Sequence, residues 1–458
     1  MIWALLLVIP PLAADENQDL WPKSTFVQSA KIQYQHVYKK SHSRQDLQHA
    51  IDLIDQAIAK FGRDPELYFI QGTFYAEVNS LDTMVLYFDS VQTFCDDETI
   101  DKKIRANCYK KEKYIDKIAK FRQSYWESSY NSGIDFLNQY DTAHAWMART
   151  SNPDSLKLLD SLSQLAYEKS KDELDLAIRM IPDSARTYDA LAILEDHAGN
   201  GAEAAAGYKK AMEYRGFDAD GVARVAYTYI QMPESENKSM KWDSSIVWFE
   251  KYLTYNPDDI NALINLSVAY SVKGEYEKSH EYIMKVLEID PENVQALTSA
   301  GQYYFSHMQD AALAIQDISE DDPNPDAARK ELEDKTEEYR KKAEEAFSKA
   351  VEVDAQNLDA LRLLGILQLL SEKNKEAADA FEQYIALNPN DLSVLDYLGR
   401  AYIKIPDYEK AILAYEKVVE IDPGNEDAWE RLAELYATVG RTADADKATA
   451  KYEDLKKL

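Results

Sequence analysis

Apolar residues recur along this chain with the spacing of amphipathic helices, and the whole pattern repeats every 34 residues. In the window 260–293, two apolar runs with three- and four-residue spacing are separated by a glycine, and a proline stands near the end. The same frame returns from residue 358, from residue 392 and from residue 426. The pattern predicts successive antiparallel helix pairs, each with a first helix A and a second helix B. The first window is marked by Leu263, Leu266, Ser267, Tyr270, Gly274, Tyr276, Ser279, Ile283, Val286 and Pro291.

Six further windows carry the frame less regularly. Three are plain units that begin at residues 31, 65 and 185, and three have longer links between their helices, Gly133–Ser170, Ala226–Ser245 and Gly301–Ala343. Ten units are therefore predicted. The expected organisation is a signal peptide at 1–14, a lead-in at 15–30, units one and two at 31–98, a linking helix with a cysteine loop at 99–125, and units three to ten at 126–184, 185–218, 219–259, 260–293, 294–357, 358–391, 392–425 and 426–458.

The residues at fixed places in these units resemble the tetratricopeptide repeat family. From residue 392 they are Leu395, Leu398, Gly399, Tyr402, Tyr408, Ala411, Tyr415, Val418 and Pro423. The resemblance implies an all-α superhelical solenoid of about ten helix-turn-helix repeats, several with insertions. It also implies a concave groove, lined by helix A, that holds a peptide or a segment of a partner protein.

Elementary packing explains the signature positions. Small residues at positions 8, 20 and 27 allow helix A and helix B to approach closely. Bulky residues at positions 4, 7, 11 and 24 are expected to fill the space between neighbouring pairs. Proline at position 32 ends helix B, because it cannot be accommodated inside a helix.

Charge and motifs exclude several classes of function. The chain has 52 Lys and Arg against 81 Asp and Glu, a net charge of −29, which disfavours nucleic acid as a partner. No apolar run reaches the roughly 18 residues of a membrane span. No metal-ligand spacing, phosphate loop or nucleophile motif is found. His280 and His197 are interpreted as surface or hydrogen-bonded imidazoles. We therefore expect a non-enzymatic protein with no cofactor and no metal.

The first residues and the two cysteines indicate an exported protein. The apolar run of residues 1–9 and the small residues up to Ala14 are typical of a signal peptide, although no Lys or Arg precedes the run. A periplasmic or secreted location is expected; the alternative is a cytoplasmic protein with a frayed end or a misplaced start codon. Cys95 and Cys108 are expected to form a disulfide worth about 3 kcal/mol, the alternative being two free thiols.

The predicted function is that of a protein–protein interaction scaffold or adaptor. The alternative is a glycan or small-ligand binding protein that uses an aromatic-lined groove. Arginines on three successive A helices could bind carboxylates, or could pair with nearby acids of the same chain. The insert at 308–342 is expected to be a solvated strut or a docking arm. The groove candidates are Tyr227, Asn261, Asn265, Gln302, Arg362, Tyr397, Arg400 and Arg431.

Overall fold

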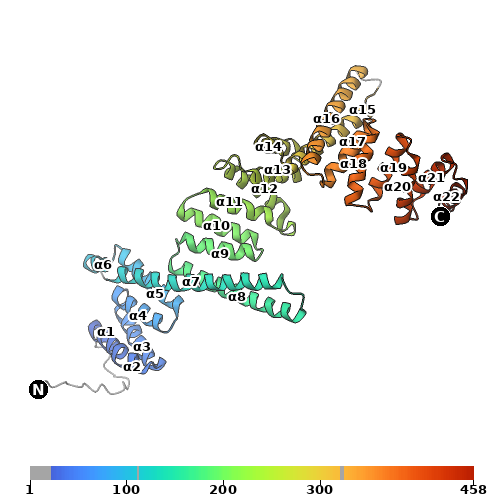
Figure 1. Ribbon diagram of the computed structural model, residues 1–458. Helices are drawn as coiled ribbons and strands as arrows, with labels where there is room; N and C mark the ends of the chain where they lie inside the picture. The colour runs from blue at the N-terminus through green and yellow to red at the C-terminus, as the bar shows by residue number, and fades with distance from the viewer. Residues whose placement is uncertain (1–21, 111–112, 320–323, 458) are drawn as a thin grey trace. The chain divides into compact units, whose positions relative to one another are not determined.

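The structure is a computed structural model that describes residues 22–110, 113–319 and 324–457 (Figure 1). Over these residues the regular structure is helical and contains no strand, so the predicted all-α class is confirmed. The predicted signal peptide, residues 1–14, lies outside the described residues. The chain divides into two compact units, one up to Phe217 and one from Asp218.

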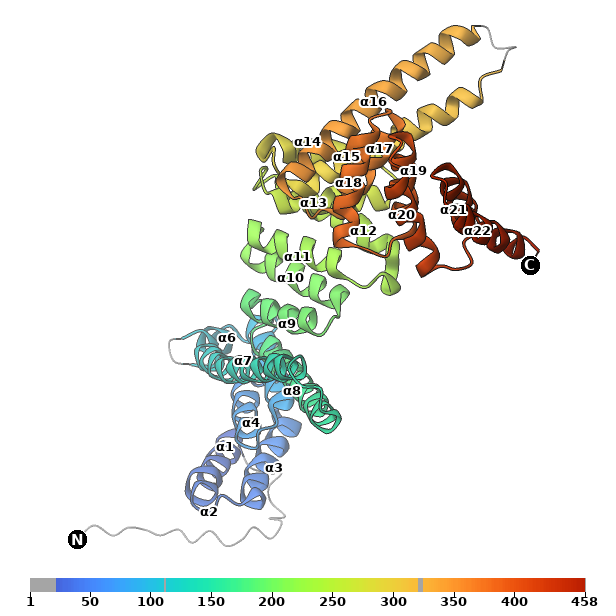
Figure 2. The same cartoon turned by 45° about the vertical axis from the view of Figure 1, so that its right-hand side comes forward.

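Unit 1 is built from helices that pack against their neighbours in sequence. Its longest pair is α7 with α8, and these two helices lie side by side in both views (Figures 1 and 2). The elements are α1 (Lys23–Ile32), η2 (Gln33–Tyr38, a π-helix), α2 (Lys39–Ser41), α3 (Arg44–Phe61), α4 (Pro65–Glu77), α5 (Leu81–Asp96), α6 (Lys102–Cys108), α7 (Tyr114–Met147), α8 (Pro153–Met180), α9 (Ala185–His197) and α10 (Gly201–Arg215).

Two predicted boundaries in unit 1 differ from the observed helices. The lead-in at 15–30 contains the start of α1, whose Phe26, Val27 and Ala30 are buried. The division at 125/126 falls inside α7, which is continuous because its 34 residues contain no proline. Its apolar stripe from Tyr114 to Tyr125 packs into the core of unit 1.

Unit 2 repeats the pair more regularly. The residue before helix A caps that helix with its side chain at intervals set by the repeat, as Asp259, Asn293, Asn357, Asp391 and Asn425 all do. The elements are α11 (Ala219–Gln231), α12 (Glu234–Leu253), α13 (Ile260–Val272), α14 (Tyr276–Ile289), α15 (Val294–Gln316), α16 (Pro325–Val353), α17 (Leu358–Leu370), α18 (Asn374–Leu387), α19 (Leu392–Lys404), α20 (Tyr408–Ile421), α21 (Glu426–Thr438) and α22 (Thr442–Leu455).

The small residue at position 8 makes room for a ring at position 24 of the same pair. A Cβ on Gly365 would lie 2.5 Å from Phe381, and one on Gly399 would lie 2.5 Å from Tyr415. Position 24 was expected to fill the space between pairs. Instead, the ring lies inside its own pair, over the backbone of helix A.

The insert at 308–342 lengthens two helices of unit 2. Helices α15 and α16 extend together as a hairpin (Figure 2), and the ring centroids of Tyr304 and Tyr339 lie 6.3 Å apart. Ion pairs one turn apart run along α16, with nitrogen–oxygen distances of 2.7 Å for Glu331–Lys335, 3.3 Å for Glu337–Lys341 and 2.6 Å for Glu338–Lys342. Among the described helices, none combines the length and the apolar character that a bilayer crossing requires.

Candidate binding groove between α13, α14 and α15

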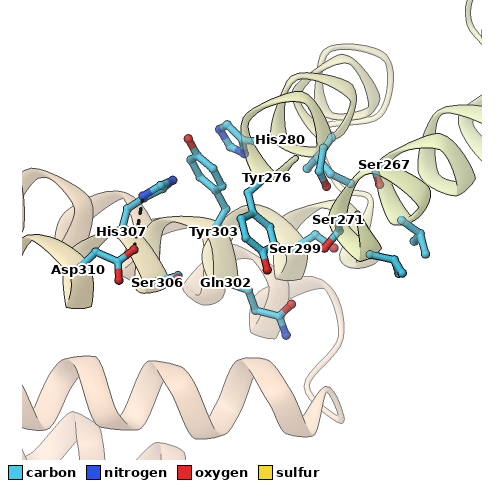
Figure 3. Close-up of a pocket in the computed structure, with 14 residues that line it drawn as sticks. Ser267, Ser271, Tyr276, His280, Ser299, Gln302, Tyr303, Ser306, His307 and Asp310 are labelled. Atoms are coloured by element: carbon cyan, nitrogen blue, oxygen red, sulfur yellow. Dashed lines mark ion pairs between the residues drawn. The ribbon is translucent and has the colours of Figure 1, made fainter. Parts of the chain in front are cut away.

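A groove of about 480 Å³ opens between two A helices and the B helix that connects them (Figure 3). Helices α13 and α15 and the first half of α14 all contribute residues to its lining. Its lining combines hydroxyls, aromatic rings, two imidazoles and aliphatic side chains. The lining residues are Ser267, Val268, Ser271, Val272, Tyr276, Ser279, His280, Ile283, Ser299, Gln302, Tyr303, Ser306, His307 and Asp310.

Stacked rings build one wall of the groove. The rings of His280 and Tyr303 are parallel within 3°, with centroids 3.9 Å apart, and Tyr303 meets His307 edge to face at 4.2 Å. His307 in turn stacks on Tyr339 of α16 at 5.5 Å. The wall is therefore fixed by contacts between three helices.

His280 is held as a neutral imidazole. Its Nε2 lies 3.1 Å from the Tyr304 hydroxyl, while its Nδ1 is buried and has no hydrogen-bond partner among the described residues. Burial lowers the pKa of His280 to about 4, and His307 and Lys342 add to that shift. A charged ring would be poorly solvated here.

We expect this imidazole to make the folded state sensitive to mild acid. A pKa below the unfolded value of about 6.5 means that the unfolded chain takes up the proton first, so stability falls between about pH 6.5 and about pH 4. Replacing His280 with Phe keeps the stack on Tyr303 and removes the titration. Thermal unfolding at about pH 7.5 and about pH 5.5 should show a smaller loss of melting temperature in H280F than in the wild type. Equal losses in the two proteins would show that the ring titrates normally.

Unused hydrogen-bonding groups face the groove. The side chains of Ser271, Ser299 and Gln302 make no hydrogen bond to another described residue. The lining contains no Lys or Arg, and its one carboxylate, Asp310, is 71% exposed at the side chain and lies 4.0 Å from His307 Nδ1. The site can therefore offer neutral donors and acceptors, together with a single negative charge.

Among the groove candidates from the sequence, Gln302 is the one that lies in this lining. Asn265 of α13 is half-buried, and the Tyr227 ring of α11 packs edge to face on Phe249 of α12, with centroids 5.1 Å apart. Asn261 is exposed at the first turn of α13. Tyr227 thus packs mainly within its own helix pair.

The candidates on later A helices are already engaged within the chain. Arg362, Arg400 and Arg431 each face a carboxylate of their own helix, with nitrogen–oxygen distances of 3.8, 3.8 and 3.2 Å to Asp359, Asp396 and Glu434. The ring of Tyr397 stacks on Phe381, with centroids 5.7 Å apart. This arrangement matches the alternative in which these arginines pair intramolecularly.

Sequence reasoning missed the aromatic wall. Tyr303 follows the candidate Gln302 directly, and His280 was interpreted as an ordinary imidazole. Their positions in the repeat could have indicated this contact. His280 is at position 21, in helix B, Tyr303 is at position 10 of the next helix A, and the two rings stack in this structure. A map of contacts between repeats, and not within them, was needed.

The cysteine pair belongs to unit 1. Cys95 lies in the last turn of α5 and Cys108 ends α6. Both are buried, and their Cα atoms lie 6.0 Å apart, a separation that a disulfide can bridge. No group of three or more His, Cys, Asp or Glu within the described ranges is placed to hold a metal ion.

Comparison with known proteins identifies three stretches of the chain. Tetratricopeptide repeat models match residues 260–293 and 340–392, and a TPR repeat model matches residues 399–440. The Protein CTR9 homolog of Arabidopsis thaliana is 31% identical over 87 residues, which are 19% of this chain and 8% of that protein. The chain thus spans a small part of that relative.

Solved structures give weaker likenesses. MamA is 25% identical with a TM-score of 0.32, over 42% of this chain and 95% of MamA. YrrB, a TPR protein with an unusual peptide-binding site, is 23% identical with a TM-score of 0.36, over 45% of this chain and 91% of YrrB. TM-scores in this range do not establish a common overall arrangement. The repeat models match the helix pairs themselves, and residues 260–293, 340–392 and 399–440 are therefore tetratricopeptide repeats.

Proposed function

We propose that this protein is a non-catalytic adaptor and that it binds a peptide segment of a partner protein in the groove between α13, α14 and α15. The observation that carries the proposal is the pairing of unused hydrogen-bonding side chains with exposed apolar ones in a single lining. Val268, Val272 and Tyr276 are 40%, 43% and 56% exposed. Covering these side chains would remove apolar surface from water, at roughly 25 cal/mol per Å².

An extended polypeptide matches this lining best. Its backbone offers alternating N–H and C=O groups, which the hydroxyls of Ser271 and Ser299 and the amide of Gln302 can satisfy. The absence of Lys and Arg from the lining, with Asp310 at its edge, favours a neutral or basic segment over an acidic one.

The aromatic residues give less support to a glycan. Stacking on a sugar needs a free ring face, but one face of Tyr303 is covered by His280 and one face of Tyr397 by Phe381, which leaves Tyr276 as the exposed ring of the groove. Nor does the groove hold an activated nucleophile: no serine hydroxyl among the described residues hydrogen-bonds to His280 or His307.

Filling the groove should abolish partner capture. Arginines at Ser299 and Ser306 would occupy the space and add positive charge, whereas arginines at Ser348 and Thr449 would lie on exposed surface outside the lining. We expect the amount of partner protein that copurifies from the native source to be at least about tenfold lower with the first double variant than with the wild type. The second variant should retain it. Full retention by the first variant, with unchanged helicity, would refute the proposed site.

We also propose that the protein is exported and that Cys95 and Cys108 are oxidised there. The apolar start of the chain supports export, and the 6.0 Å between the two Cα atoms supports the bond. Fractionation of cells that make the protein should place it in the periplasm or the medium. Its accumulation in the cytoplasm with free thiols would contradict both parts.

A further inference from the structure

A second surface, in unit 1, exposes apolar side chains beside a groove. Helix α8 exposes leucines at the spacing i, i+4, i+7, and Leu158, Leu162 and Leu165 are 61%, 48% and 49% exposed. Near the end of α7, Trp146 is 59% exposed. Between the two helices lies an apolar groove of about 330 Å³, which includes Phe136, Ala143, Leu159 and Ala166. We call it the α7–α8 groove.

Without a partner, contact between these apolar side chains and water is unfavourable in free energy. Scattered apolar residues on a surface are ordinary, but here Phe136, Trp146, Leu159, Leu162 and Leu165 line one groove, and the exposed Leu158 precedes these leucines on α8. The spacing of the leucines is that of the contact face of an amphipathic helix, and a groove between two helices accepts a third helix as its natural occupant.

The charges beside the groove identify the partner. On α8, Asp154 lies four residues before Leu158, Glu168 lies three residues after Leu165, and Asp172 lies one turn beyond Glu168; Asp135 is exposed on α7. None of these four carboxylates has an ion-pair partner among the described residues. The positive charge in the lining is Lys169, whose Nζ lies 5.2 Å from the centre of the Phe136 ring.

Acidic edges exclude two occupants on physical grounds. A second copy of the chain would bring a second set of the same unpaired carboxylates to the contact, and both copies carry a net charge of −29. An anionic membrane surface would repel these edges, because helices that bind such surfaces carry Lys and Arg on their polar face.

We propose that the α7–α8 groove binds a basic amphipathic helix of a partner protein. The apolar face of that helix would cover Phe136, Trp146, Leu162 and Leu165, while Lys or Arg side chains along its flanks would pair with the four carboxylates. This site is separate from the groove in unit 2, so either site can fail without the other.

A designed peptide tests this site. The probe is a fluorescently labelled helical peptide of about 18 residues with leucines at i, i+3, i+4 and i+7 and lysines beside them, and its partner probe has glutamates in place of the lysines. Fluorescence anisotropy with the full-length chain at about 0.15 M salt should give binding at least about tenfold tighter for the lysine peptide. The triple variant W146S/L162S/L165S should weaken that binding by at least about tenfold.

Matched variants separate the site from the general charge of the chain. The triple variant L86S/L370S/L413S changes leucines that are 65%, 63% and 65% exposed elsewhere, and it should bind the lysine peptide within about twofold of the wild type. D135K/D154K/E168K should weaken binding, whereas E333K/E352K/D446K, at exposed positions outside the groove, should weaken it much less.

Three results would overturn the proposal. They are unchanged binding in W146S/L162S/L165S, equal affinity for the glutamate peptide, and equal loss in the two sets of lysine variants. Two further results would replace the proposed occupant: sedimentation that shows a dimer lost in the leucine variant, or cosedimentation with phosphatidylserine vesicles lost in that variant.

Discussion

Replacing Gly365 with Ala is expected to destabilise unit 2 by about 2 kcal/mol, although alanine is the better helix former by about 1 kcal/mol. The reason is steric. The new Cβ would lie 2.5 to 2.8 Å from three atoms of the Phe381 ring, which is fully buried. Ordinary contacts between carbon atoms are about 3.5 to 4.0 Å long, so the ring or the helix must move. Urea unfolding followed by circular dichroism measures the loss.

A second substitution shows that the ring is the cause. F381L removes part of the obstruction, so G365A/F381L should be less destabilised than the sum of the two single variants by at least about 0.5 kcal/mol. Ser267 provides the matched control, because it occupies position 8 in a pair where position 24 is Ile283. S267A should cost about 1 kcal/mol or less. Additive effects of G365A and F381L would contradict the packing described here.

With Cys95 and Cys108 oxidised as proposed, C95A/C108A is expected to be less stable by about 3 kcal/mol, because the bond would close a loop with a sequence separation of 13. Most of this free energy comes from restricting the unfolded chain and is therefore lost even where native contacts are kept. Thermal unfolding of unit 1 should be the transition that changes.

A reductant distinguishes the bond from simple packing. Both cysteines are buried, so alanine also removes some apolar contact. Dithiothreitol should lower the melting temperature of the wild type toward that of the variant and leave the variant unchanged. If the wild type were insensitive to the reductant, the thiols would be free in the folded protein.

The helix pairs were predictable because their determinants are local. Gly399 at position 8, Asp391 before the first turn and Pro423 after the last one all act within a single pair. The ends of α7 were harder to predict from the sequence, because the repeat frame suggested a boundary at a place where no residue ends the helix. The role of Phe381 also needed the structure, since a ring at position 24 could face its own helix A or the next pair.

The candidate sites were predictable only in part. Assigning helix A to the inner face identified Gln302, but Tyr303 and His280 come together through contact between two repeats, which a single-repeat pattern does not contain. The leucines of α8 were recognisable as helical. Their exposure depends on how much of α8 is covered by α7, and no local pattern encodes that.

A photocrosslinking amino acid at Gln302 tests the central claim most directly. In cells that make the protein, irradiation should join this position to a segment of one partner protein, and the same amino acid at Ser348, exposed on α16 outside the groove, should not capture that protein. Mass spectrometry of the joined peptides would then identify the segment, which should be neutral or basic. If Gln302 captured no protein while Ser348 did, the groove between α13, α14 and α15 would not be where this chain holds its partner.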